Sequence, residues 1–155
     1  MDGQLRRDRY RKLYEIARSY GLRLVYLFGS QADLGAKYLE GGCPELVDPL
    51  ADLDVGVVLQ SDELRPLERA KLYGALSMEI QELFSPFTVD LVLLGETHSV
   101  LQAEAICGKC VYSESDDERG RYEERILARA ADFKPVLDLF HKERLEERHD
   151  KPNSR

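Results

Sequence analysis

The sequence predicts a single domain of the α/β (α+β) class. Short runs of apolar, β-branched and aromatic residues, which are typical of strands, alternate with longer segments whose apolar residues recur every three or four positions, which is typical of amphipathic helices. The length of 155 residues fits one domain, and a composition of 43% hydrophobic and 33% charged residues is that of an ordinary globular protein. We therefore expect one domain over residues 1–155.

The first half of the chain predicts a helix, a strand, an irregular segment and a second strand. A helix is expected over residues 5–20, where apolar residues have helical spacing and Gly21 follows in the place of a C-cap. Residues 22–28 (LRLVYLF) predict a buried strand. Residues 33–49 are rich in glycine and proline, so we expect an exposed insertion there, with at most one short helix. The second strand is expected over residues 52–59 (DLDVGVVL).

The second half predicts three more helices and two more strands. We expect a helix from Ser61 to about residue 84, because Ser61 is a good N-cap, and then an apolar strand over residues 87–94. Thr97 should cap a short helix, and residues 109–113 should form an edge strand. A long helix is expected over residues 119–149, and the chain from about residue 146, which overlaps the end of this helix, is expected to be a charged tail. Pro135 is expected to kink this helix, and its narrow apolar stripe consists of Ile126, Ala130, Phe133, Leu137 and Phe140.

Charge and cysteine content exclude several classes of protein. The chain has 29 acidic and 22 basic residues, a net charge of -7 that disfavours generic nucleic-acid binding. No signal peptide and no apolar run of membrane-spanning length is found, so we expect a cytoplasmic protein without a membrane span. Cys107 and Cys110 have the spacing of half a zinc site or a redox pair, but packing around a turn is the favoured interpretation because the sequence contains no second such pair.

Three aspartates occupy positions at which strands of this composition are normally apolar. Side chains alternate along a strand, so Asp52 and Asp54 should point the same way, with Cα atoms roughly 6–7 Å apart. Asp90 lies within the most apolar strand, where a lone carboxylate would be costly. If these two strands are neighbours, the three carboxylates converge and require divalent cations, for which magnesium fits best. The alternative for the acid pair alone is a turn or cap at the start of a strand.

The pair Gly29-Ser30 directly follows the first predicted strand. Glycine allows the backbone to approach a ligand closely, and the serine hydroxyl and nearby amides can donate to phosphate oxygens. A helix start at about residues 31–34 would add further donors. We therefore expect Gly29 and Ser30 to bind a nucleotide, and the alternative is a plain turn.

Together these residues resemble the polymerase-β-like nucleotidyltransferase superfamily. Its signature is a strand that ends in Gly-Ser (here Gly29-Ser30), an acid-x-acid pair on the next strand (Asp52-Leu53-Asp54) and a third acid on a later strand (Asp90). Within it, the chain resembles the minimal nucleotidyltransferase (MNT) group from about residue 24 to residue 145. The resemblance implies a small mixed sheet with flanking helices and a long C-terminal helix. It also implies two Mg²⁺ ions held by the three aspartates, which are then the catalytic residues, with ATP as substrate.

Two departures from the family pattern concern the segment before the acid pair. The family usually places about ten residues between Gly-Ser and the first acid, whereas residues 31–51 intervene here. This difference is the reason for expecting an insertion at 33–49. The serine that often precedes the first acid is Ala51 in this chain, which removes one hydroxyl but no carboxylate.

The family also implies a partner. Many MNT proteins silence a HEPN (higher eukaryote and prokaryote nucleotide-binding) ribonuclease toxin by attaching AMP to one of its tyrosines. The function implied first is therefore a protein adenylyltransferase antitoxin. Two alternatives stay open at this point, namely nucleotide transfer to a small hydroxylated molecule such as an aminoglycoside, and a non-catalytic module that neutralises a toxin by contact.

Overall fold

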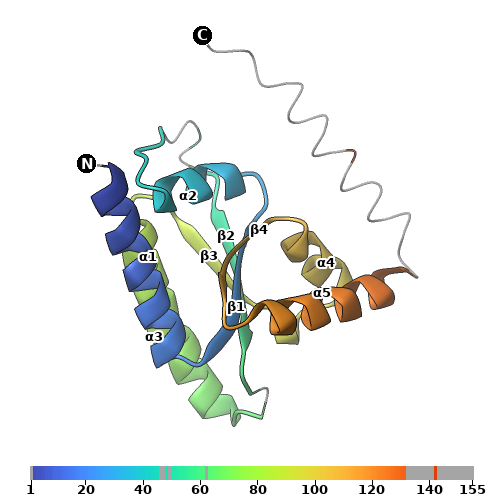
Figure 1. Cartoon of the computed structure of the whole chain (residues 1–155). Coiled ribbons are helices and arrows are strands. Elements are labelled where there is room, and N and C mark those ends of the chain that lie inside the picture. Colours follow the sequence, from blue (N-terminus) through green and yellow to red (C-terminus); the bar gives the residue numbers. More distant parts are fainter. Residues whose placement is uncertain (1, 46–47, 49, 62, 132–141, 143–155) are drawn as a thin grey trace.

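A four-stranded sheet forms the centre of the part of the chain that the structure describes. The computed structural model describes residues 2–45, 48, 50–61, 63–131 and 142. The strands lie in the order β3-β2-β1-β4, and β1 is antiparallel to β2 and β4, whereas β2 and β3 are parallel. The predicted small mixed sheet is thereby confirmed (Figure 1). The strand bounds are β1 (Leu22–Phe28), β2 (Leu53–Leu59), β3 (Val89–Leu93) and β4 (Lys109–Ser113).

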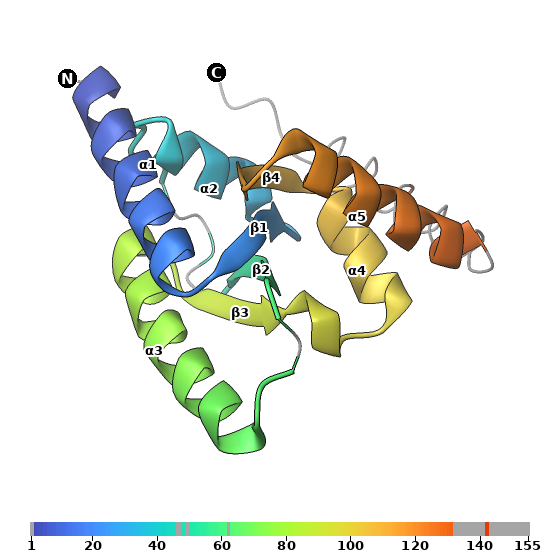
Figure 2. The ribbon, with the colours of Figure 1, turned by 60° about the horizontal axis from the view of Figure 1, so that its bottom comes forward.

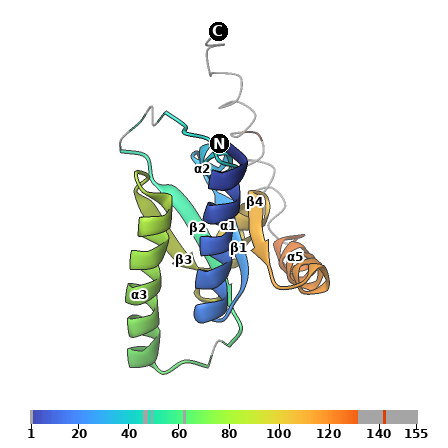
Figure 3. The ribbon, with the colours of Figure 1, turned by 60° about the vertical axis from the view of Figure 1, so that its left-hand side comes forward.

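Helices cover both faces of this sheet. The long helices α1 and α3 lie side by side on one face, and α4 and α5 lie on the other (Figure 3). Helix α2 lies at one end of the sheet, close to β4 (Figure 2). None of the described helices combines the length and apolarity that crossing a membrane requires. The helix bounds are α1 (Asp2–Ser19), α2 (Ala32–Leu39), α3 (Pro66–Phe84), α4 (Ser99–Ile106) and α5 (Asp116–Ala130), with a short 3-10 turn η1 (Leu94–Glu96).

Two apolar cores, one on each face, hold the sheet between its helices. Alternate residues of β1 and β2, such as Leu27 and Val55, pack against α1 and α3. The intervening residues, such as Tyr26 and Val58, pack against α4 and α5. Because both faces are covered, β1 is apolar along nearly its whole length, which explains why it was predictable as a buried strand.

Helix α5 covers the sheet of its own chain. It begins at Asp116, three residues before the predicted start, because the Ser115 hydroxyl accepts a hydrogen bond from the Glu118 backbone N–H at 3.1 Å. Ile126 and Ala130, the first two residues of the predicted stripe, are buried against α4 and β1. The remaining stripe residues, Pro135 and the charged tail lie outside the described residues, so the predicted length of this helix stays a prediction.

The start of α3 differs from its predicted start. The Ser61 hydroxyl does accept a backbone N–H, that of Glu63, but the helix begins only at Pro66. Proline fits the first position of a helix because its φ is fixed near the helical value and no N–H is needed there. The predicted helix start at Ser61 is therefore wrong by five residues: the Ser61 hydroxyl forms a local turn, and the N-cap of α3 is Arg65. Similarly, His98 rather than Thr97 caps α4, with its Nδ1 accepting the Leu101 N–H at 3.3 Å.

The segment predicted as an exposed insertion is partly built into the core. One short helix, α2, is present as expected, but its residues Gly35 and Leu39 are buried. Arg9 of α1 donates hydrogen bonds to the carbonyls of Tyr38 and Gly42, which ties the segment to α1. A Cβ at Gly35 would lie 2.8 Å from Leu53 Cδ1, so glycine allows α2 to pack closely on β2. The prediction of exposure is wrong for this helix because its glycine hid the apolar periodicity.

Candidate active site

The three predicted aspartates gather where β2 and β3 begin. Because β2 and β3 are parallel and in register, Asp54 lies directly beside Asp90. Leu53 is fully buried on the α3 side of the sheet, so Asp54 points to the opposite side. Asp52 immediately precedes β2, one residue before the strand begins, and is exposed. The structure therefore places Asp54 and Asp90 side by side, with Asp52 two residues before Asp54 and close enough for its charge to act on it.

The surroundings of Asp90 differ from the sequence-based expectation. Asp90 was expected to be costly because β3 is so apolar, yet its side chain is exposed. It is the second residue of an edge strand. The buried residues of that strand, Leu91 and Leu93, lie on the other face, packed in the α1 and α3 core. The carboxylate that burial does affect is Asp54.

Asp54 has a pKa raised to about 6. The main cause is burial, followed by the negative charges of Asp90, Glu104 and Asp52. Burial removes solvent from the charged form, and three neighbouring carboxylates disfavour a further negative charge. A bound cation at this position would therefore relieve this repulsion.

Glu104 of α4 is the site residue that sequence reasoning missed. It is half-buried, between the fully buried Ala103 and Ala105. Its charge acts on Asp54 because α4 packs across the same face of the sheet as the Asp54 side chain. The segment Ala103-Glu104-Ala105-Ile106 contributes to the resemblance to the MNT group, but its sequence does not say which strand the helix covers.

Gly29 and Ser30 lie beside the carboxylates. Phe28, the last residue of β1, pairs with Asp54, so Gly29 follows directly next to that side chain. Gly29 has a φ of 76°, and a Cβ at this position would lie 2.3 Å from Asp54 Oδ2. Both the backbone conformation and the close approach require glycine. Ser30 is exposed, and α2 begins two residues later at Ala32, so the predicted helix start after the pair is confirmed.

Carboxylates are the ligands that a hard divalent cation prefers. Within the part of the chain that the structure describes, no three His, Cys, Asp or Glu side chains are gathered tightly enough to form a metal-binding group by themselves. Magnesium usually takes only one or two carboxylates and fills its other positions with water and substrate phosphates. Here the carboxylates lie at the starts of two adjacent strands, next to a loop with an exposed hydroxyl. Such an arrangement would leave the remaining positions around a metal ion to water and substrate phosphates.

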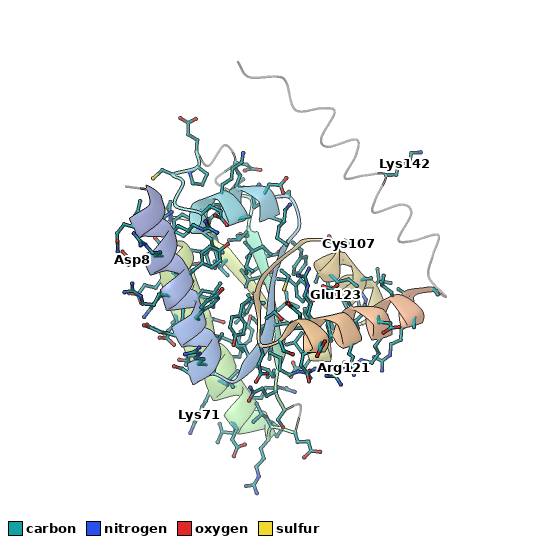
Figure 4. All side chains as sticks on the ribbon, in the orientation of Figure 1. Asp8, Lys71, Cys107, Arg121, Glu123 and Lys142 are labelled. Atoms are coloured by element: carbon teal, nitrogen blue, oxygen red, sulfur yellow. The ribbon has the colours of Figure 1, made fainter. Side chains whose placement is uncertain are left out.

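The cysteine pair lies on the far side of β1 from α1. Cys107 follows α4 (Figure 4). Cys110 lies in β4, where its thiol donates to the Tyr112 carbonyl at 3.3 Å. Burial raises the pKa of the Cys110 thiol. Cys110 packs against the core that α5 covers. In Figure 4, Glu123 lies on the inner side of α5, where it accepts a hydrogen bond from Tyr26 at 2.9 Å.

Comparison with known families identifies the fold. The family model described as polymerase beta, nucleotidyltransferase, matches residues 11–117, which include Gly29, Ser30 and the three aspartates. The chain belongs to this nucleotidyltransferase family. The match confirms the family resemblance and the fold class inferred from the sequence. No curated protein sequence matches the chain.

Solved structures with the same fold come from toxin–antitoxin complexes. This nucleotidyltransferase resembles a chain of a toxin–antitoxin crystal structure with AMP-PNP, with a TM-score of 0.54, 19% identity and coverage of 85% of this chain and 98% of that one. A chain of the complex between a tri-AMPylated Shewanella oneidensis HEPN toxin and MNT antitoxin matches with a TM-score of 0.52 and 19% identity. The match covers 88% of this chain and 98% of that one. A chain of the toxin–antitoxin MntA–HepT matches with a TM-score of 0.51 and 18% identity, and the match covers 87% of this chain and 98% of that one.

Proposed function

We propose that this nucleotidyltransferase transfers AMP from ATP to a tyrosine of a cognate HEPN-type toxin and so acts as its antitoxin. The observation that carries the proposal is the register between Asp54 and Asp90, with Gly29-Ser30 beside them. This arrangement supports a metal ion at the carboxylates and phosphates at the adjacent loop. The acceptor is inferred from the complexes of AMPylated HEPN toxin and of MNT antitoxin that share the fold.

In this proposal Asp52, Asp54 and Asp90 hold two Mg²⁺ ions, and Gly29 and Ser30 hold the triphosphate. The bound ions would supply charge neutralisation and lower the pKa of the attacking hydroxyl. The tyrosine oxygen forms a bond to the α-phosphorus of ATP, the bond to the β-phosphate oxygen breaks, and pyrophosphate leaves. The exposed Asp90 can reach an incoming hydroxyl from solvent and accepts its proton as general base.

The test of this function is the fate of the label in ATP. The chain is co-expressed with its HEPN partner, purified and incubated with Mg²⁺ and ATP labelled either on the α- or on the γ-phosphate. We expect the α-label alone to appear on a toxin tyrosine. An Asp52→Asn, Asp54→Asn double variant is the control and should leave the toxin unlabelled.

Each other outcome contradicts the proposal in a different way. Transfer of the γ-label would indicate a kinase. Capture of the toxin without either label would favour the non-catalytic module. Labelling of an added aminoglycoside in place of the toxin would favour a small-molecule acceptor.

Ser30→Ala should weaken ATP binding more than it changes folding. Its hydroxyl is exposed and accepts a long hydrogen bond, 3.4 Å, from the Gln31 side chain. Loss of one charge-assisted hydrogen bond to phosphate should cost about 1–3 kcal/mol of binding free energy, measured by calorimetric titration. Ser19→Ala at the exposed end of α1 is the matched control and should bind ATP normally. Equal affinity of the Ser30→Ala variant and the wild type would reduce Gly29-Ser30 to a turn.

A further inference from the structure

A lysine of β4 lies beside the proposed phosphate loop, although the two are far apart in sequence. In the antiparallel pair of β1 and β4, Lys109 lies opposite Leu27. Gly29 and Ser30 follow two and three residues after Leu27, so they emerge from the same end of the sheet at which β4 begins. Figure 2 shows α2 next to β4, which it contacts. Pairing with the rigid, buried β1 fixes the Lys109 backbone in this place.

The partner of Lys109 belongs to the first turn of the helix that follows the loop. Its Nζ lies 3.8 Å from Oδ1 of Asp33, the second residue of α2. The two side chains are 52% and 53% exposed, and the distance is long for an ion pair. An exposed pair of this kind contributes little to folding stability. The ammonium group can therefore leave Asp33 for a stronger anion at small cost.

The site carries several negative charges, so a cation is expected close to the phosphates of a bound nucleotide. Asp54 already lies in the field of Asp90, Glu104 and Asp52, and a triphosphate would add several further negative charges. Metal ions would neutralise charge at the carboxylates, whereas phosphates bound at Gly29-Ser30 would lie next to the start of α2, two residues later. Arg9, another cation near α2, is already bound to the carbonyls of Tyr38 and Gly42.

We infer that Lys109 binds the terminal phosphates of the donor nucleotide, and that Asp33 holds the lysine in place when no nucleotide is bound. This inference rests on the proposed function, since it assigns the triphosphate to the Gly29-Ser30 loop. Lys109 is thus a substrate-binding residue contributed by β4. Asp33 is a competitor for the same ammonium group, and its negative charge also opposes the phosphates.

The experiment compares ATP with AMP, because only ATP carries the terminal phosphates. With the full chain and Mg²⁺, ATP affinity is measured by calorimetric titration and AMP affinity by competition. Lys109→Ala should weaken ATP binding by about tenfold or more, as expected for a lost charge-assisted contact, and leave AMP binding unchanged. Lys109→Arg should retain most of the ATP affinity. Lys37→Ala is the matched control, since this lysine lies in the last turn of α2.

Asp33 gives the second arm of the test. Asp33→Asn should tighten ATP binding several-fold in the wild-type background. The gain should be smaller in the Lys109→Ala background, where only the repulsion between Asp33 and the phosphates is removed. A lysine with a purely structural role would lower the melting temperature when removed and weaken ATP and AMP alike. That result, or unchanged ATP affinity of Lys109→Ala, would overturn the inference. If the wild type itself binds no ATP, the proposed function fails and the inference fails with it.

Discussion

Asp54→Asn should abolish AMP transfer and make the protein more stable at neutral pH. Asp54 is the central carboxylate of the site, flanked by Asp90 in the register of the sheet and by Gly29 after β1. A neutral amide cannot balance a divalent ion. Loss of an outer-shell partner of a metal typically costs 10–100-fold in affinity or activity, so the loss of a direct ligand should cost more than about 100-fold in the transfer rate.

The gain in stability should depend on pH in a defined window. The folded pKa of Asp54 is about 6, against an ordinary value of 3.8. Below pH 3.8 the group is protonated in both states and has no effect on the free energy of unfolding. Between pH 3.8 and about pH 6, Asp54 is ionised in the unfolded chain but still largely protonated in the folded state. Asp54 therefore destabilises the folded state progressively as the pH rises, and the effect is complete above about pH 6. Solvent screening of this half-buried group should limit the shift in melting temperature to a few degrees.

Melting curves between pH 3.5 and pH 8, without metal, test this dependence. Below about pH 4, the Asp54→Asn variant should have the same melting temperature as the wild type. From about pH 6 upward, the melting temperature of the variant should be the higher of the two. Added Mg²⁺ should raise the melting temperature of the wild type and not that of the variant. Asp8→Asn, on the outer side of α1 (Figure 4), removes a carboxylate away from the site and is the control. If the Asp54→Asn variant transfers AMP at the wild-type rate, Asp54 is not a metal ligand. If the difference in stability between variant and wild type does not depend on pH, the carboxylate of Asp54 is not destabilised by burial and by its charged neighbours.

The strands and the acid pair were predictable because local patterns define them. Residues 22–28 form the strand expected from their apolar run, and Leu53 separates two aspartates as the two-residue repeat of a strand requires. The pairing of β2 with β3 was only a condition in the sequence argument. No local sequence pattern shows which strands are neighbours in a sheet. The structure shows that β2 and β3 are neighbours and that Asp54 lies opposite Asp90.

The residues that the sequence did not reveal act across long-range contacts. Glu104 reaches Asp54 only because α4 covers the same face of the sheet, and Lys109 reaches Asp33 only because β4 pairs with β1. The exposure of Asp90 was misjudged for a related reason. The average hydrophobicity of β3 describes the strand as a whole, whereas Asp90 lies near its beginning and at the edge of the sheet.

Gly29→Ala should impair both folding and transfer, although it adds a single methyl group. The backbone of Gly29 has a φ of 76°, a conformation that costs an alanine about 1–2 kcal/mol. The new Cβ would also lie 2.3 Å from Asp54 Oδ2, so either the carboxylate or the loop must move. Displacement of about 1 Å at a reacting centre can cost on the order of 100-fold in rate. We therefore expect a lower melting temperature and a transfer rate reduced by about that factor.

A double-variant cycle separates the two causes. Asp54 Cβ would lie 3.7 Å from the new methyl group, an ordinary contact, so Asp54→Ala removes the clash and leaves only the backbone cost. Gly29→Ala should thus lower the unfolding free energy less in the Asp54→Ala background than in the wild type. Gly120→Ala is the control, because a Cβ there meets nothing within 4 Å, and it should stabilise α5 by about 0.5–1 kcal/mol. Equal costs of Gly29→Ala in both backgrounds would mean that the loop does not touch the Asp54 carboxylate in solution, and the proposed proximity of phosphate loop and metal ligand would be wrong.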